Sequence, residues 1–517
     1  MHNPSLGRST LAFGALTATI GVTLTLAHAS AQGPVSDRSQ TPRAWDDRAM
    51  ATLELPLAHR SASPVPVAAE YYYRIPVRPV YKTYPVYHPG KEPAGYFERL
   101  TRLDPEVVLF DAATVKTEAD WIRLGEIVFD TPTDYDISGS PEQFRDAAYY
   151  EALGIPVAAG GTVPFVRYVI REKGKVEVGI LACGTCHTRV MPDGTVVKGG
   201  QGKFPFDRTG PPELPDEALP DFRRLVKMLY SAPWLGAEDP GRPLETMAYR
   251  EMLELGRAIP PGVQARHGTA LQIPAQIPDL IGVKDRRYLD HTGLVRHRGI
   301  GDVMRYAALN QAVDLYSRHG DFVPIADDWR TVPDPSRQSS FVFANGRFSD
   351  EQLYALATFL YALEPPKNPN PTNALTARGQ EVFASSGCGA CHTPPLYTNN
   401  KLTPASGFQP PAGGVDPADV MSRSVATDPA LALKTRRGTG FYKVPSLKGL
   451  WYRGPFEHSG SVATLEDWFD PRRLRDDYVP TGFKGHGVTT RAVKGHEFGL
   501  RLSVSDKAAL IAFLKTL

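Results

Sequence analysis

The chain has 517 residues, of which 42% are hydrophobic and 22% charged, and its 58 basic residues nearly balance its 56 acidic ones. This length allows two or three domains with sizeable cores. The formal net charge of +2 gives no reason to expect nucleic acid or an anionic membrane as a partner.

Residues 1–31 have the features of a secretory signal peptide. Arg8 supplies the positive start, the apolar run 11–26 is too short for a good membrane span, and Ala29-Ser30-Ala31 is a cleavage site of the A-x-A type. The alternative is a retained membrane anchor. No later stretch reaches the apolar length of a transmembrane helix. We therefore expect a periplasmic or secreted protein with no membrane span in the mature chain.

Residues 32–100 form a Pro/Tyr-rich arm. Between Ala68 and Tyr96, several tyrosines lie among prolines. Proline at this density excludes a helix and favours an extended or polyproline-like chain. We expect an irregular arm that packs along the body with its tyrosines as anchors. A segment for partner docking or electron relay is the alternative.

The remaining chain divides into two larger units. Residues 101–365 form the first, residues 366–373 form a proline-rich linker, and residues 374–517 form the second. Thr117 and Asp120 resemble a capping box at the start of a helix. Further elements of the first unit are expected from periodicity and β-branched content: a hairpin within 155–180 and helices at 219–231, 244–255 and 353–363.

The pattern C-x-x-C-H occurs twice, at Cys183–His187 and at Cys388–His392. Two thiols at this spacing add to the two vinyl groups of one porphyrin, and the following histidine binds the iron. A pair of zinc or redox CxxC motifs is the alternative, but a histidine follows each second cysteine and no other cysteine exists. We therefore predict two covalently bound haem c groups and no disulfides. The attachment sites are Cys183, Cys186, Cys388 and Cys391, and the iron ligands are His187 and His392.

The two units share an internal repeat. Ile277–Gly282 matches Val444–Gly449, and at the same offset His291-Thr292-Gly293 matches His458-Ser459-Gly460. Each unit also closes with a similar apolar helix. These matches predict a mostly α fold, in which two cytochrome c-like haem domains are related by internal duplication and follow the irregular N-terminal arm.

The second unit resembles the di-haem cytochrome c peroxidase superfamily. Lys443–Leu450 and Phe456–Glu466 are similar to the family patterns K-x-P-x-L-R-N-V and Y-F-H-D-G-S-V-x-T-L-E. The resemblance is specific for 374–517, weaker for 101–365 and absent from the arm, and the layout is closest to the rubber-oxygenase-like branch. It implies two cytochrome c-like domains, a bound Ca²⁺ ion, and reduction of hydrogen peroxide or a related oxidation.

Departures from the family pattern concern the ligands of the second haem. The peroxidases use a methionine after the His-x-G motif, whereas the last methionine here, Met421, precedes it. His496 lies where rubber-oxygenase-like proteins place a distal histidine, so we predict it as the second ligand of that iron. His486 is the competing ligand. His458 is interpreted as structural.

In the peroxidases that this chain resembles, a histidine shortly after the first C-x-x-C-H motif is a removable sixth ligand, whereas here no histidine occurs between His187 and His267. We therefore predict an open or weakly ligated iron at the first haem. His291 replaces the tryptophan that the peroxidases carry, and we predict it as the distal catalytic acid–base or ligand. The alternative is a packed histidine equivalent to His458. His297, Asp302, Tyr306 and Gln311 lie with His291 on the segment expected to cover this haem, and Arg296 or Arg298 would stabilise developing charge.

Three functions follow from these expectations. The leading one is an exported di-haem oxidoreductase, in which the first haem activates peroxide or dioxygen and the second relays electrons from a small electron-donor protein. The first alternative is a haem dioxygenase of the rubber-oxygenase kind. The second is a di-haem electron-transfer cytochrome, in which both irons have two protein ligands and no substrate binds.

Overall fold

The computed structural model describes residues 41–517 except 112–113, 136–138, 212 and 325–345. The signal peptide predicted at 1–31 lies outside the described residues. The longer helices are α4 (Glu118–Asp130), α7 (Leu219–Tyr230), α8 (Tyr249–Arg257), α9 (Ile300–Gln311), α10 (Asp350–Ala362), α11 (Ala374–Ser385) and α14 (Val504–Leu514). The shorter ones are α1 (Asp47–Ala51), α2 (Ala69–Arg74), α3 (Tyr96–Leu100), α5 (Ala147–Leu153), α6 (Cys183–Cys186), α12 (Ala430–Leu433) and α13 (Leu465–Trp468).

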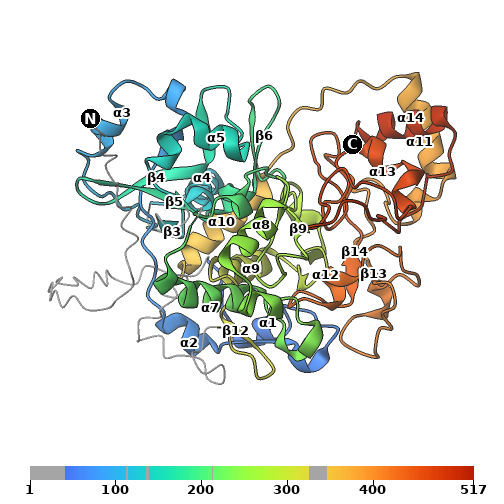
Figure 1. Ribbon diagram of the computed structural model, residues 1–517, viewed down its shortest axis with the longest axis horizontal. Coiled ribbons are helices and arrows are strands. Elements are labelled where there is room, and N and C mark those ends of the chain that lie inside the picture. The colour runs from blue at the N-terminus through green and yellow to red at the C-terminus, as the bar shows by residue number, and fades with distance from the viewer. Residues whose placement is uncertain (1–40, 112–113, 136–138, 212, 325–345) are drawn as a thin grey trace, which may run out of the picture.

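An antiparallel four-stranded sheet lies at the end of the molecule opposite α11 and α14 (Figure 1). Its strand order is β2-β4-β5-β3, with β2 (Thr83–Tyr87), β3 (Asp134–Tyr135), β4 (Thr162–Glu172) and β5 (Lys175–Ile180). Five two-stranded ribbons complete the described strands. They are β1 (Pro64–Pro66) with β12 (Ser317–His319), β6 (Thr188–Val190) with β7 (Val196–Lys198), β8 (Val263–Gln264) with β9 (Ala275–Gln276), β10 (Tyr288–Leu289) with β11 (Val295–Arg296), and β13 (Leu402–Pro404) with β14 (Phe441–Lys443).

The expected mostly α class is wrong. Helices make up 34% of the residues and strands 14%, and the strands form several sheets. The expectation of two duplicated cytochrome domains is wrong as well. Residues 374–517, all of which are described, contain one two-stranded ribbon and nothing that corresponds to the four-stranded sheet. The likeness between the units is local: it comprises the C-x-x-C-H motifs, the segments Ile277–Gly282 and Val444–Gly449, the H-x-G segments and one helix pair in each unit.

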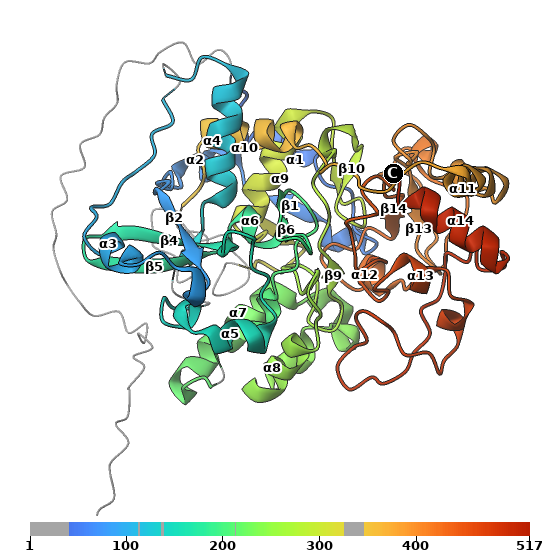
Figure 2. The ribbon, with the colours of Figure 1, turned by 90° about the horizontal axis from the view of Figure 1, so that it is seen from above.

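The arm is not irregular, as the sequence analysis expected. It contains α1, α2 and α3, and its strand β2 pairs with β4 at the edge of the sheet. Trp45 is fully buried and stacks on the equally buried Tyr72, with ring centroids 4.3 Å apart. These two rings belong to the main core, which combines the arm with α4, α9 and α10. The arm is therefore an integral part of the first unit (Figure 2).

Helix α4 begins at the capping box that the sequence indicates. The Asp120 N–H donates to Thr117 Oγ1 at 3.2 Å, and the Thr117 N–H donates to the Asp120 carboxylate at 3.1 Å. Two of the first unpaired N–H groups of the helix are thereby satisfied. Leu124, Gly125 and Val128 are buried on the face that packs against α10.

Two helix pairs pack at unusually close range because each has a glycine at the crossing. A Cβ atom on Gly125 of α4 would lie 2.0 Å from the Ala355 carbonyl oxygen of α10, and one on Gly379 of α11 would lie 2.0 Å from the Ala509 carbonyl oxygen of α14. Neither helix can tolerate a side chain there unless the pair separates. Each C-x-x-C-H motif lies next to one of these helix pairs. Gly184 of the first motif is close to the end of α4, and Cys388 of the second motif comes shortly after α11 in the chain.

We expect Gly125→Ala to lower the free energy of unfolding by about 1–3 kcal/mol, because overpacking forces the helices apart. Chemical denaturation followed by far-ultraviolet circular dichroism measures the change. Gly160→Ala is the matched control, because Gly160 is exposed and has no atom within 4 Å of an added Cβ. Equal stabilities of the two variants would contradict the close approach of α4 and α10.

No helix within the described part of the chain is both long and apolar enough to cross a membrane.

Candidate haem sites

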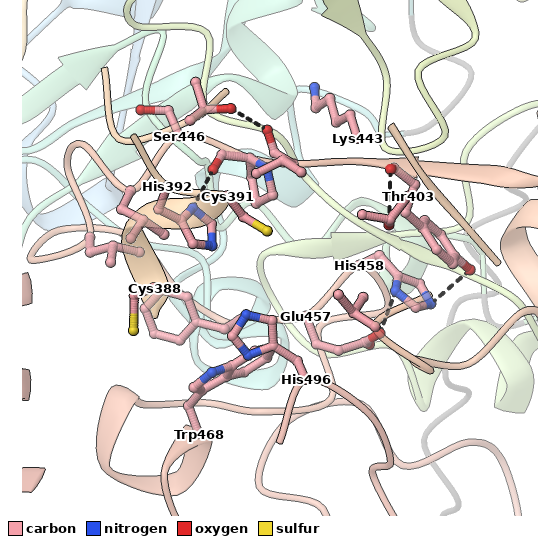
Figure 3. Close-up of a pocket in the computed structure, with 18 of the residues that line it drawn as sticks. Cys388, Cys391, His392, Thr403, Lys443, Ser446, Glu457, His458, Trp468 and His496 are labelled. Carbon is pink, nitrogen blue, oxygen red and sulfur yellow. Dashed lines mark hydrogen bonds and ion pairs between the residues drawn. The ribbon is translucent and has the colours of Figure 1, made fainter. Parts of the chain in front are cut away.

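The second C-x-x-C-H motif lines a cavity of about 260 Å³ (Figure 3). Helix α11 ends at Ser385, Gly387 turns the chain with a φ of +74°, and Cys388 opens a short 3-10 turn. Cys388, Cys391 and His392 all face the cavity, whose walls are largely apolar side chains of both units. A concave, mostly apolar space with a few polar groups is the usual form of a cofactor site.

His392 is oriented by backbone carbonyls. Its Nδ1 lies 3.2 Å from the Pro445 oxygen and 3.2 Å from the Tyr397 oxygen. An imidazole that donates Nδ1–H to a carbonyl has its Nε2 lone pair free for a metal, and this is the usual outer-shell arrangement of a ligating histidine. Burial lowers the pKa of His392, which favours the neutral form that binds metal.

His496 lies opposite His392 across the same cavity (Figure 3). The centroids of the two rings are 6.2 Å apart. Two imidazoles that share one metal through nitrogen–metal bonds of about 2 Å would have ring centres roughly 6 Å apart. The rings of Trp468 and Phe498 hold His496 at centroid distances of 5.2 and 5.3 Å. The measured spacing therefore fits one iron between the two histidines.

The protonation state of His496 agrees with this fit. Burial lowers its pKa to about 3, so the imidazole is neutral. Its Nδ1 is buried and has no hydrogen-bond partner among the described residues. The competing ligand, His486, is exposed and lies outside the residues that line the cavity. Of the two candidates, His496 is the one that geometry brings to the motif.

Basic side chains outnumber acidic ones around this cavity. Asp279 and Glu457 line it, as do four cations, Arg286, Arg423, Lys443 and Arg453. Burial lowers the pKa of Lys443 to about 7, and Lys443 makes no ion pair with any described residue. A net positive lining of this kind suits a group that carries carboxylates, as a haem does.

The first C-x-x-C-H motif forms α6, directly after β5. The Thr185 hydroxyl donates to the Phe165 oxygen of β4 at 2.8 Å, so the four-stranded sheet fixes the motif. His187 Nδ1 lies 2.9 Å from the Pro278 oxygen. Pro278 is the repeat counterpart of Pro445, so both motif histidines are oriented in the same way. Burial lowers the pKa of His187 to about 4.

The motif cysteines do not have the properties of reactive thiolates. Burial raises the pKa of Cys183 and of Cys186 to about 12, whereas redox-active CxxC motifs have a depressed thiol pKa. No group of three or more His, Cys, Asp or Glu side chains among the described residues is placed to hold a metal ion. Calcium remains implied by the family resemblance alone.

A buried network of charges lies beside the first motif. Arg266 Nη1 is 2.9 Å from the Asp290 carboxylate, and Arg437 Nη1 is 2.5 Å from the same group. Arg437 also contacts Asp314, which in turn lies 3.1 Å from His267 Nε2. Burial opposes ionisation of both aspartates, but the guanidinium groups hold the pKa of each below its usual range.

The network reaches the motif through the segment that contains Arg266. Cys186 Sγ lies 3.2 Å from the Gln264 side-chain oxygen, two residues before Arg266. The Arg266 charge lowers the pKa of His187, although burial lowers it more. Sequence analysis missed His267 and Asp314, because no motif contains them and they come from separate loops.

His291, predicted as the distal residue of the first haem, lies beside the second motif. Its Nε2 lies 2.6 Å from the Gln276 oxygen, and its imidazole lines the cavity of the second motif. Of the other candidates, Tyr306 belongs to the charge network through Arg266, at 2.8 Å. The others have partners outside the network: Arg298 pairs with Asp302, Gln311 accepts from the Phe348 N–H, and Arg296 donates to the Gly414 carbonyl of the second unit. His297 Nε2 lies 2.6 Å from the Tyr361 hydroxyl. The assignment of His291 to the first haem stays a prediction.

Each H-x-G segment accepts a backbone hydrogen bond from the other unit. The Lys443 N–H of β14 donates to the His291 oxygen at 2.9 Å, and the Gln276 N–H of β9 donates to the His458 oxygen at 2.8 Å. Glu457 pairs with His458 Nδ1, and Tyr442 stacks on the same ring at 4.3 Å. These contacts agree with a structural role for His458.

Comparison with known proteins identifies neither a family nor a function for the chain. No family model matches the chain, and no curated protein matches it. Among solved structures, the chain is similar to a hydrazine synthase of Kuenenia stuttgartiensis, with a TM-score of 0.29 and 15% identity over 59% of this chain and 88% of that one. It is also similar to a MauG-like protein associated with microbial copper homeostasis, with a TM-score of 0.28 and 16% identity over 59% and 90%. At these TM-scores the likeness carries no argument, so function has to be argued from the two sites.

Proposed function

We propose that this chain is an exported di-haem c-type oxidoreductase, in which the haem at Cys183 and Cys186 activates peroxide and the haem at Cys388 and Cys391 relays electrons to it. When bound, a c-type haem supplies one-electron redox chemistry and, where a coordination position is open, a site for peroxide or dioxygen. The observation that carries the proposal is the contrast between the two sites.

The second site supports the electron-relay role. His392 and His496 face each other at a spacing that fits one iron, and a haem with two strong protein ligands transfers electrons and does not bind a substrate. Trp468 and Phe498 fix His496, and the basic side chains around the cavity would hold the propionates.

The first site supports the reactive role. His187 would bind the iron from one side, with its ring held by the Pro278 oxygen. The neighbouring network offers titratable groups, namely His267 beside Asp314 and Tyr306 beside Arg266. Reduction of hydrogen peroxide to two waters consumes two electrons and two protons, so a reactive haem needs acid–base groups nearby. A small electron-donor protein would supply the electrons.

Spectroscopy of the purified ferric protein tests this proposal. We expect one high-spin and one low-spin EPR signal, and a rapid change of the high-spin species when hydrogen peroxide is added. A stable oxygen-bound form that ignores peroxide would favour the dioxygenase. Two low-spin signals that stay inert to peroxide, even after half-reduction, would identify an electron-transfer cytochrome and refute the proposal.

A further inference from the structure

Glu54, in the arm, presents a carboxyl group to a small cavity inside the first unit. Its backbone is fixed beside β11, where the Leu55 N–H donates to the Leu294 oxygen at 2.7 Å. The cavity measures about 10 Å³, and Asp314 and Ser317 also line it. A polar cavity of roughly this size takes a single water. Ser317 Oγ is buried there without a hydrogen-bond partner among the described residues.

Glu54 is the carboxyl group of this region whose pKa is raised, whereas the pKa values of Asp290 and Asp314 are lowered. Burial, and to a smaller degree the charge of Asp314, raise the pKa of Glu54 to about 8. The other charged and titratable groups that face it are Asp290, Arg266 and Arg437 from the network and His319 and Arg436 from the cavity wall. The Glu54 carboxyl is therefore a proton donor held beside ionised carboxylates.

Asp314 connects this cavity to the first haem motif. Asp314 lines the cavity, and its Oδ2 lies 3.1 Å from His267 Nε2. Arg437 Nη2 contacts the same carboxylate oxygen and lies 3.2 Å from the same ring nitrogen. The Asp314 backbone is held in the left-handed region at φ +60°, after Val313 at +46°. Such conformations are costly for residues other than glycine and gather at functional sites.

His267 is the end of the connection nearest the motif. It follows Arg266, whose charge acts on both Cys186 and His187, and Gln264, whose oxygen lies 3.2 Å from Cys186 Sγ. Burial lowers the pKa of His267 to about 4, so its imidazole is neutral and one ring nitrogen can accept a proton.

We propose that Glu54, Asp314 and His267 form a proton-supply line from the arm to the first haem. The inference rests on the proposed function. Reduction of one hydrogen peroxide breaks its O–O bond, takes two electrons from the electron-donor protein by way of the second haem, and takes two protons to form two waters. The line supplies one of these protons: the Glu54 O–H bond breaks, the proton passes along Asp314 and His267, and a new O–H bond forms on the departing oxygen. Glu54 regains its proton from solvent.

Redox-difference infrared spectroscopy of the holoprotein tests the line without turnover. We expect reduction of the haems to perturb a C=O stretching band of a protonated carboxyl that shifts in D₂O. The band should fade as the pH rises through about 8, and Glu54→Gln should abolish it. Glu70→Gln is the matched control, because Glu70 is an exposed acid of the same arm. A wild-type spectrum without such a band, or a band unchanged in Glu54→Gln, would overturn the proposal.

Stopped-flow mixing with hydrogen peroxide gives the second readout. Glu54→Gln and His267→Gln should each slow the peroxide-driven spectral change about tenfold or more, since proton transfer by a positioned group contributes on the order of 100-fold or more. His267→Gln should retain the infrared band, because Glu54 is untouched. Wild-type rates in both variants would overturn the line and leave the proposed function standing. A wild-type protein that shows the band but ignores peroxide would instead refute the proposed function.

Discussion

Replacing Cys388 and Cys391 with serine is expected to remove one of the two haems from each polypeptide. Serine hydroxyls cannot form the thioether bonds, so the porphyrin would have only His392 and His496 to hold it. The pyridine haemochrome yield per polypeptide should fall by half, and the intact mass should fall by that of one haem. The pair Cys183→Ser and Cys186→Ser should give the same loss at the first motif, and all four substitutions together should leave no covalent haem.

The control for this experiment is Ala384→Ser, which adds a hydroxyl at an exposed position of α11 close to the second motif. It should keep the full haem content. If the wild-type protein contained zinc, or a reversible dithiol, in place of covalent haem, both C-x-x-C-H assignments would be wrong and the proposed function would fall with them.

Replacing His496 with glycine is expected to convert the second haem from low spin to high spin. The imidazole is the group that faces His392 at 6.2 Å between centroids, and Trp468 and Phe498 keep it there. Its loss would open a coordination position on that iron and raise the reduction potential, because the axial ligand is a main determinant of haem potential. EPR and a spectroelectrochemical titration measure the two changes.

Added imidazole should restore the low-spin signal of this variant, since the space left behind has the shape of the lost ring. His486→Gly is the matched control and should leave the spectrum unchanged, because His486 is exposed. A low-spin second haem in His496→Gly without imidazole, together with loss of that signal in His486→Gly, would reverse the assignment of the ligand.

Local sequence signals predicted several elements with near-correct bounds. The capping box at Thr117 marks the start of α4, and the hairpin expected within 155–180 is formed by β4 and β5. The helix expected at 219–231 is α7. In each case the signal is contained in the segment itself, as a cap, a helical apolar face or β-branched residues around a turn.

The errors arose where a local signal was extended too far. Proline density between Ala68 and Tyr96 does not exclude a helix, because α2 ends at Arg74, just before the first proline of that stretch at Pro76. The pairing of β2 with β4 joins strands about 80 residues apart, and no local pattern reports it. The repeat was equally misleading, because matched motifs do not require matched domains around them.

The candidate sites follow the same division. The C-x-x-C-H motifs and His496 could be predicted from the sequence because each lies within a recognisable local pattern. The network of His267, Asp314, Asp290 and Arg437 could not be predicted from the sequence, because its members come from separate loops and are close only in the folded chain. Glu54 joins them from the arm, far from either motif in the sequence.

The backbone hydrogen bonds that the H-x-G segments make with the other unit limit how the chain can be divided into fragments. Because Lys443 of β14 holds the His291 loop and Gln276 of β9 holds the His458 loop, each half would lose two of its anchoring points if produced alone, and would expose the edge of a strand. A protease cut in the 366–373 segment would leave a nicked but associated pair. Split versions of the protein therefore have to be co-expressed as complementing fragments.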